Sequence, residues 1–199
     1  MSPKLVIALA GGLALVAVLV VGLVQLAGSP APSQTPPAKR LTPAQMQARL
    51  VGSPAPLAAL HAQADQLLGG GASALRARLT TLEGRPVVVN KWASWCTPCR
   101  EEFGAFQRAA TNMGREVAFI GIDSGDSGRA KPLAFLKAFP VSYPSYYDPS
   151  EQIGLEVSDS TFVPATVFYN RRGEKYIQDG AFPNAAKLER DVHRYAMVG

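Results

Sequence analysis

The chain has 199 residues, enough for one ordinary domain with accessory segments. Its net charge of +5 comes largely from the N-terminal region, since residues 41–199 carry 17 Lys and Arg against 15 Asp and Glu without a basic stripe, which gives nucleic-acid binding no support. Two cysteines and two histidines are too few for a disulfide scaffold or for a four-ligand zinc site formed by one chain.

Residues 5–24 form an uninterrupted apolar run. As a helix this run has a length of about 30 Å, the thickness of a bilayer's hydrocarbon core. The alternative is a cleaved signal peptide, but its apolar region is usually about 7–15 residues long, and residues 27–29 match a cleavage site poorly. We therefore predict an uncleaved membrane anchor, a single transmembrane helix within residues 1–27, in the cytoplasmic membrane.

Residues 28–40 contain four prolines in thirteen residues and are predicted to be an extended linker between the anchor and a domain at residues 41–199. This domain is predicted to begin with a helical extension. Thr42, Pro43 and Gln45 offer an N-cap, a first-turn proline and a capping-box glutamine. Two further helices are predicted from leucine spacing, at Leu57, Leu60, Ala64, Leu67 and Leu68, and at Leu75, Leu79 and Leu82.

Strands and helices alternate in the rest of the chain. Strands are predicted at residues 86–92, 116–123, 143–147, 165–169 and 174–178, with helical segments at 97–113, 130–138 and 150–155 and a last helix capped by Asn184. Residues 170–173 form a plausible hairpin turn between the last two strands. This alternation indicates an α/β fold in which helices cover both faces of the sheet.

The two cysteines, Cys96 and Cys99, directly follow an apolar strand and open a predicted helix. The unpaired N–H groups and the dipole of a helix N-terminus stabilise a thiolate at Cys96 and lower its pKa. Cys99, one turn deeper, can attack a mixed disulfide formed by Cys96. Pro98 fits the first helical turn, where its missing N–H has no cost. We expect an exposed Cys96 and a shielded Cys99.

Other interpretations of the Cys-x-x-Cys motif fit less well. A purely structural bridge would close a loop of only four residues, which gives little entropic stabilisation. A zinc site would need two more ligands, and the only histidines, His61 and His193, lie far away in the sequence. We therefore expect no metal and no cofactor other than a redox-active disulfide.

Residues 90–103, which include Trp92-Ala93-Ser94-Trp95-Cys96-Thr97-Pro98-Cys99, closely resemble the active-site stretch of thioredoxins. The run from Asn90 through Trp95 is similar to the membrane-tethered TlpA-like and ResA-like branch of that superfamily, and the resemblance covers about residues 70–198. It implies a thioredoxin fold, with a central mixed sheet flanked by helices and an extra strand and helix inserted before a cis-proline loop.

The resemblance also assigns roles outside the Cys-x-x-Cys motif. It implies that Pro164 is a cis proline facing the disulfide and that Val163 offers its backbone to an extended substrate; an ordinary trans proline opening a strand is the alternative. Glu102 matches a position where this branch often has an acid near the thiols, so it is either a proton acceptor and donor or a solvated first-turn glutamate.

Two positions depart from the pattern of thioredoxins. Asn90 stands where thioredoxins proper usually have a buried aspartate, so that proton acceptor is missing. Lys91 occupies a strand position that is usually apolar, and its ammonium must find a partner, shift its pKa or reach solvent.

The resemblance implies an extracytoplasmic thiol-disulfide oxidoreductase that reduces disulfides of exported proteins, including apocytochrome c, with electrons from a membrane thiol carrier. One alternative is an oxidase of the same fold that introduces disulfides. A peroxiredoxin-like peroxidase is less consistent, since nothing matches its Thr-x-x-Cys peroxide site. A non-enzymatic copper-binding or structural module is disfavoured because related copper chaperones have a Cys-x-x-x-Cys spacing.

Overall fold

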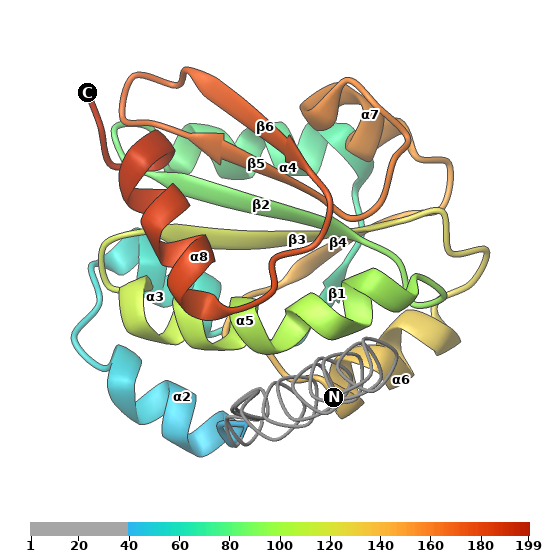
Figure 1. The fold of residues 1–199 in the computed structure, drawn as a ribbon, viewed down its shortest axis with the longest axis horizontal. Coiled ribbons are helices and arrows are strands. Elements are labelled where there is room, and N and C mark those ends of the chain that lie inside the picture. Colours follow the sequence, from blue (N-terminus) through green and yellow to red (C-terminus); the bar gives the residue numbers. More distant parts are fainter. Residues whose placement is uncertain (1–39) are drawn as a thin grey trace, which may run out of the picture. The chain divides into compact units, whose positions relative to one another are not determined.

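The computed structural model describes residues 40–199, and the predicted anchor and all but the last residue of the predicted linker lie outside this range (Figure 1). The helices are α2 (Pro43–Leu50), α3 (Ala55–His61), α4 (Gly71–Thr81), α5 (Thr97–Met113), α6 (Ala130–Ala138), α7 (Gln152–Ser158), α8 (Ala185–Asp191) and the π-helical turn η1 (Val192–Ala196). The strands are β1 (Leu67–Leu68), β2 (Val87–Trp92), β3 (Ala118–Ser124), β4 (Ser145–Asp148), β5 (Ala165–Tyr169) and β6 (Lys175–Asp179).

The six strands form one mixed sheet in the order β1-β4-β3-β2-β5-β6. The first four strands of this order are parallel, whereas β5 runs antiparallel to both β2 and β6. Trp92 at the end of β2 pairs with Asp123, and Lys91 pairs with Ala165 at the start of β5. The ends of β2 and β3 and the start of β5 therefore lie at one edge of the sheet.

Strand β2 is the central strand, and all six of its residues are buried. Its side chains alternate between two apolar layers, as the pleat of a strand requires. Val88 and Trp92 belong to the layer formed with α5, α6 and α8, whereas Val87 and Val89 belong to the layer formed with α3, α4 and α7. The helices thus cover both faces of the sheet (Figure 1), as the sequence predicted.

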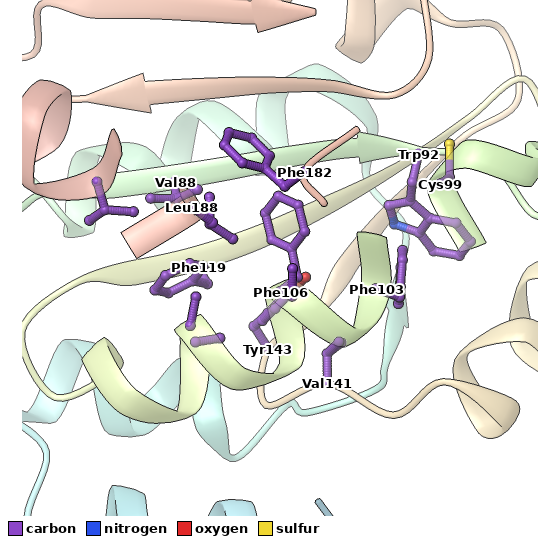
Figure 2. Packing of buried hydrophobic residues seen from close by; sticks show 14 of the residues in the cluster. Val88, Trp92, Cys99, Phe103, Phe106, Phe119, Val141, Tyr143, Phe182 and Leu188 are labelled. Carbon is purple, nitrogen blue, oxygen red and sulfur yellow. The ribbon is translucent and has the colours of Figure 1, made fainter. Parts of the chain in front are cut away.

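The layer on the α5 side is rich in aromatic rings (Figure 2). The indole of Trp92 meets the ring of Phe103 edge to face at 5.1 Å and stacks on Phe135 at 4.9 Å. Phe106 and Phe182 meet at 6.1 Å further along α5. Offset and edge-to-face pairs of this kind add to the stabilisation from apolar burial, so aromatic contacts help to hold β2 against the first turns of α5.

Most predicted elements are present with small shifts at their ends. The capping box at Thr42 and Gln45 is formed, α5 has the predicted bounds, and the predicted strands and helices between residues 116 and 179 are found within a few residues. The inserted strand and helix are β4 and α7.

The prediction of a helix through Leu67 and Leu68 is wrong. The helix of this region, α3, ends at His61, and Asp65 adopts a left-handed conformation with φ of 59°. Leu67 and Leu68 then form β1, which pairs in parallel with β4. Leucine spacing alone did not separate a short buried strand from the end of a helix, because both place apolar side chains toward the core.

Within residues 40–199, no helix combines the length and the apolarity that a membrane span needs.

Candidate active site

Three loops meet at the edge of the sheet described above. The first, residues 93–96, connects β2 to α5; the second, residues 125–129, follows β3; and the third, residues 159–164, precedes β5. In open α/β sheets the carboxyl ends of parallel strands are the usual place for a functional site. Both cysteines lie at this edge.

Cys96 and Cys99 form a disulfide at the N-terminus of α5, with their Cα atoms 5.3 Å apart. Cys96 is the N-cap residue, and its Sγ accepts a hydrogen bond from the backbone N–H of Cys99 at 3.2 Å. A first-turn N–H group thus points at the sulfur, where it would stabilise negative charge. Pro98 lies in the first turn, as expected.

The exposure of the two cysteines differs little. Cys96 is 4% exposed and Cys99 is fully buried. The prediction of an exposed Cys96 is therefore wrong for the disulfide form, in which the bond to Cys99 and the Cys99 N–H hold its sulfur against the helix end. Figure 2 shows the Cys99 sulfur beside the Trp92 ring, at the end of the aromatic layer.

Two large apolar side chains are exposed in the loops of this edge. Trp95, directly before Cys96, is 61% exposed, and Phe162 is 52% exposed. The peptide bond between Val163 and Pro164 is cis, as the resemblance implied. Val163 packs against the apolar layer that includes both cysteines, and Pro164 directly precedes β5. The structure therefore brings Trp95, Val163 and Pro164 to the same edge as the disulfide.

The loop before Cys96 is held by Asp126. The Asp126 carboxylate accepts hydrogen bonds from the backbone N–H and from the hydroxyl of Ser94, both at 2.7 Å. On the other side, the Arg100 guanidinium donates to the Ser94 carbonyl at 3.1 Å and lies over the ring of Phe135. The approach to Cys96 is thus fixed by side chains from α5 and from the loop after β3.

Glu102 is fully buried on α5, one helical turn after Cys99. Its Oε2 accepts a hydrogen bond from the Phe182 N–H at 3.1 Å, and its Oε1 has no hydrogen-bond partner among the described residues. Burial raises the pKa of Glu102 to about 8, against the opposing effects of the Phe182 N–H and the Asn90 side chain. The alternative of a solvated first-turn glutamate is wrong.

A second buried carboxyl, Asp123, lies at the end of β3 next to the Trp92 backbone. Neither of its oxygens has a hydrogen-bond partner among the described residues. Burial, followed by the influence of Asp126 and Asp148, raises the pKa of Asp123 to about 9, while Arg129 acts in the opposite direction. This carboxyl is therefore expected to be neutral near pH 7.

The two departures from the thioredoxin pattern are both buried in β2. Asn90 faces the α5 layer, and neither polar atom of its side chain completes a hydrogen bond within residues 40–199. Lys91 does not reach solvent; its ammonium donates to the hydroxyl of Ser158 and to the carbonyl of Ser160. Burial lowers the pKa of Lys91. The Lys91 ammonium therefore has hydrogen-bond partners and also a lowered pKa, but no access to solvent.

Sequence reasoning missed the contact between Ser94 and Asp126 and the buried Asp123. The sequence analysis assigned no role to residues 124–129, between the predicted strand at 116–123 and the predicted helix at 130–138. The sequence held a signal for this contact, because β2 and β3 were both predicted as strands. The segments that follow two neighbouring parallel strands meet at one edge of the sheet, which would bring the residues after β3 close to those before Cys96.

The chain is similar in sequence to proteins named for thiol-disulfide exchange. The AhpC/TSA family model matches residues 51–174. The thiol-disulfide oxidoreductase ResA of Bacillus subtilis (strain 168) is 29% identical over 100 residues, which are 50% of this chain and 55% of ResA. The thiol:disulfide interchange protein DsbE of Allochromatium vinosum is 38% identical over 76 residues, 38% of this chain and 40% of DsbE. The chain thus spans about half the length of these curated relatives.

A solved structure supports the fold. The structure of MTB DsbF in its mixed oxidized and reduced forms superimposes with a TM-score of 0.52 at 26% identity, over 57% of this chain and 83% of DsbF. Together with the sheet order and the helices on both faces, this similarity confirms the thioredoxin-like α/β fold.

The buried Glu102 predicts a pH-dependent stability. Its folded pKa of about 8 lies above the ordinary value of 4.5, so the folded chain keeps a proton that the unfolded chain releases. Its contribution to the free energy of unfolding is therefore complete below about pH 4.5 and falls as the pH rises to about 8. Glu102→Gln cannot ionise and should gain roughly 3–5 kcal/mol relative to the wild type over this interval.

Urea unfolding of both oxidised proteins at several pH values measures this difference. Glu101→Gln is the matched control, since Glu101 is the neighbouring residue on α5 but is exposed. The Glu101 variant should follow the wild type at every pH. If the free energy of unfolding of Glu102→Gln differed from that of the wild type by the same amount at every pH, this result would contradict the raised pKa of Glu102.

Proposed function

The chain belongs to the AhpC/TSA family, and on this basis we propose that it is a thiol-disulfide oxidoreductase whose Cys96–Cys99 pair exchanges electrons with disulfides of other proteins. One observation carries the proposal: the two sulfurs are joined at the N-terminus of α5, above a buried carboxyl whose pKa is raised toward neutrality. The names of ResA and DsbE describe the same chemistry in those relatives. No cofactor beyond the disulfide is needed.

In the first step the reduced enzyme attacks its substrate through Cys96. The Cys96 thiolate, stabilised by the Cys99 N–H and by the helix N-terminus, attacks one sulfur of the substrate disulfide. The substrate S–S bond breaks as the mixed disulfide forms, and the second substrate sulfur leaves as a thiolate that takes a proton from water.

In the second step Cys99 resolves the mixed disulfide. The ionised form of Glu102, whose share grows as the pH approaches its pKa of about 8, takes the proton of Cys99, and the resulting thiolate attacks Cys96 Sγ. The Cys96–Cys99 bond forms, and the remaining substrate sulfur leaves as a thiolate and is protonated. The substrate gains two electrons and two protons in total, and the enzyme is left oxidised.

Glu102 suits this proton transfer because of its surroundings. A group that accepts and returns a proton near neutral pH works best with a pKa close to that pH, and burial raises the pKa of Glu102 to about 8. Oε1, which has no hydrogen-bond partner among residues 40–199, is one oxygen available for a proton. When the pair is reduced again by an electron donor, the same carboxyl returns the proton to Cys99.

For substrate binding we propose the exposed surface around the disulfide. Trp95 and Phe162 offer apolar contact area, and the Val163 backbone next to Pro164 pairs with an extended substrate segment. Thiol- or disulfide-containing exported proteins, among them apocytochrome c, are the proposed substrates, and a membrane thiol carrier is the proposed electron donor. The names of the ResA and DsbE relatives describe thiol-disulfide chemistry and support thiol- or disulfide-containing proteins as the substrate class.

For localisation we propose the arrangement that the sequence predicted. Residues 1–27 anchor the chain in the cytoplasmic membrane, residues 28–40 are a linker, and residues 41–199 are the catalytic domain on the extracytoplasmic side. The apolar run at residues 5–24 supports the anchor.

The division of roles between the cysteines is tested by trapping. A Cys99→Ser variant should accumulate mixed disulfides with its substrates through Cys96, because the resolving thiol is missing. A Cys96→Ser variant, expressed at the same level, is the control and should trap far less. Non-reducing gels with reversal by dithiothreitol measure the adducts. Equal trapping by the two variants would show that Cys96 is not the attacking thiol.

The direction of electron flow is tested by the reduction potential. A reductase should lie near the thioredoxin value of about −270 mV, and a strong oxidant near about −120 mV. The helix N-terminus at Cys96 stabilises the reduced thiolate and so raises the reduction potential, as in an oxidant. The resemblance to the ResA-like branch instead favours the low potential of a reductant. We expect the reductant. Equilibration in glutathione or dithiothreitol buffers decides it, and a potential above about −180 mV would favour the oxidase.

The anchored form is tested with intact spheroplasts. Added protease should remove residues 28–199 and leave a small membrane fragment, because the domain lies outside the cytoplasmic membrane. A cytoplasmic protein that stays intact is the control for membrane integrity. Full protection of the domain, or release of a form lacking residues 1–27 without protease, would contradict the anchored form.

A further inference from the structure

Lys91 is a buried ammonium next to the active-site loop, and the proposed reaction does not use it. It lies on β2, five residues before Cys96, and is fully buried on the face of the sheet opposite α5. Burial lowers the pKa of Lys91, and the carboxylates of Glu151, Asp148 and Asp179 act in the opposite direction. A buried charge of this kind is costly unless its hydrogen bonds are made.

Both side-chain hydrogen bonds of Lys91 reach the segment that leads to the cis proline. Its Nζ donates to Ser158 Oγ at 3.3 Å and to the carbonyl oxygen of Ser160. The Ser160 hydroxyl in turn accepts a hydrogen bond from the Phe162 N–H at 3.0 Å. Lys91 is thus connected through Ser160 to the backbone of Phe162, which carries an exposed ring and directly precedes Val163.

The same lysine also holds the other end of this segment. Its backbone pairs with Ala165, the first residue of β5. Residues 160–164 therefore form a loop whose start accepts a hydrogen bond from the Lys91 side chain and whose end leads into β5 opposite the Lys91 backbone. The cis Val163–Pro164 bond lies inside that loop.

Helix α7 is built to admit the lysine. A Cβ atom on Gly154 would lie 2.7 Å from Lys91 Cε and 3.1 Å from Cδ, too close for any other residue without movement. The Gly154 N–H is held by Asp148 Oδ2 at 2.7 Å, and the Ser158 hydroxyl lies 2.7 Å from the Gly154 carbonyl. Gly154 therefore leaves the space that the Lys91 stem occupies, and Ser158 provides an acceptor for its ammonium.

We propose that Lys91 is a positioning residue that fixes residues 160–164 beside the disulfide, so that the Val163 backbone and the Phe162 ring are already arranged for an extended polypeptide. This inference rests on the proposed thiol-disulfide exchange, for which Lys91 sets the affinity for protein substrates. Small disulfides, which make no contact along the loop, depend on it much less. A loop held in its bound conformation loses less conformational entropy on binding.

Lys91→Met tests the proposal, since methionine keeps the apolar stem and removes the N–H donors. With insulin as the disulfide substrate and dithiothreitol as the donor, KM should rise about five- to tenfold, whereas kcat should change less than about twofold, as for a loss of substrate binding alone. Hydrogen exchange of the Phe162 and Val163 amides should become about tenfold faster. Ser158→Ala, which removes one acceptor, should give smaller changes in the same direction.

Lys131→Met on α6 is the control, because Lys131 is exposed, and it should match the wild type. Rates with a small aromatic disulfide are measured in parallel. The proposal would be overturned if Lys91→Met left both the KM for insulin and the hydrogen exchange of the loop amides unchanged. It would also be overturned if the variant lost the same fraction of its rate with insulin and with the small disulfide. A wild type that fails to reduce insulin would refute the proposed function instead, while the exchange of Phe162 and Val163 would still test the role of Lys91.

Discussion

Strand β2 and helix α5 are joined by only four residues, and the site follows from this short connection. The strand is central and buried on both faces, so its end is fixed by packing on each side. The helix begins at once and is held to the strand by the contact of Trp92 with Phe103. Cys96 therefore becomes the N-cap of α5, where unpaired N–H groups favour a thiolate. A longer connection would leave the sulfurs free of that field.

The same burial that fixes the strand and the helix also isolates ionisable groups around the disulfide. Glu102 and Asp123 lie on the α5 face of the sheet, and Lys91 lies on the other face. Each is displaced from its ordinary pKa in the direction that favours its neutral form, as expected when a charge leaves water. The two carboxyls can hold protons near neutral pH, whereas the lysine meets its hydrogen-bonding needs from α7 and from the loop before β5.

These groups divide the site into parts with different tasks. Asp126 and Arg100 fix Ser94 and so the approach to Cys96. Glu102 stands below Cys99, where a proton must be moved if the pair is to cycle. The inserted α7 is bound near its start by Asp148 and at its end by Lys91. Both residues belong to strands, so the sheet fixes the position of the segment before Pro164. In this arrangement the insertion supports the loop that carries the cis Val163–Pro164 bond.

The sequence by itself determined the α/β order, the bounds of α5 and the place of Cys96 and Cys99 at a helix N-terminus. These features depend on local patterns: apolar runs, capping residues and a three-residue spacing that survives in any fold. Only the tertiary structure decided that Leu67 and Leu68 form a strand, that Glu102 is buried, that Asp126 holds Ser94 and that Lys91 reaches Ser160. Each of these depends on contacts between residues distant in the chain, and a local pattern does not contain the partner that determines burial, pairing and pKa.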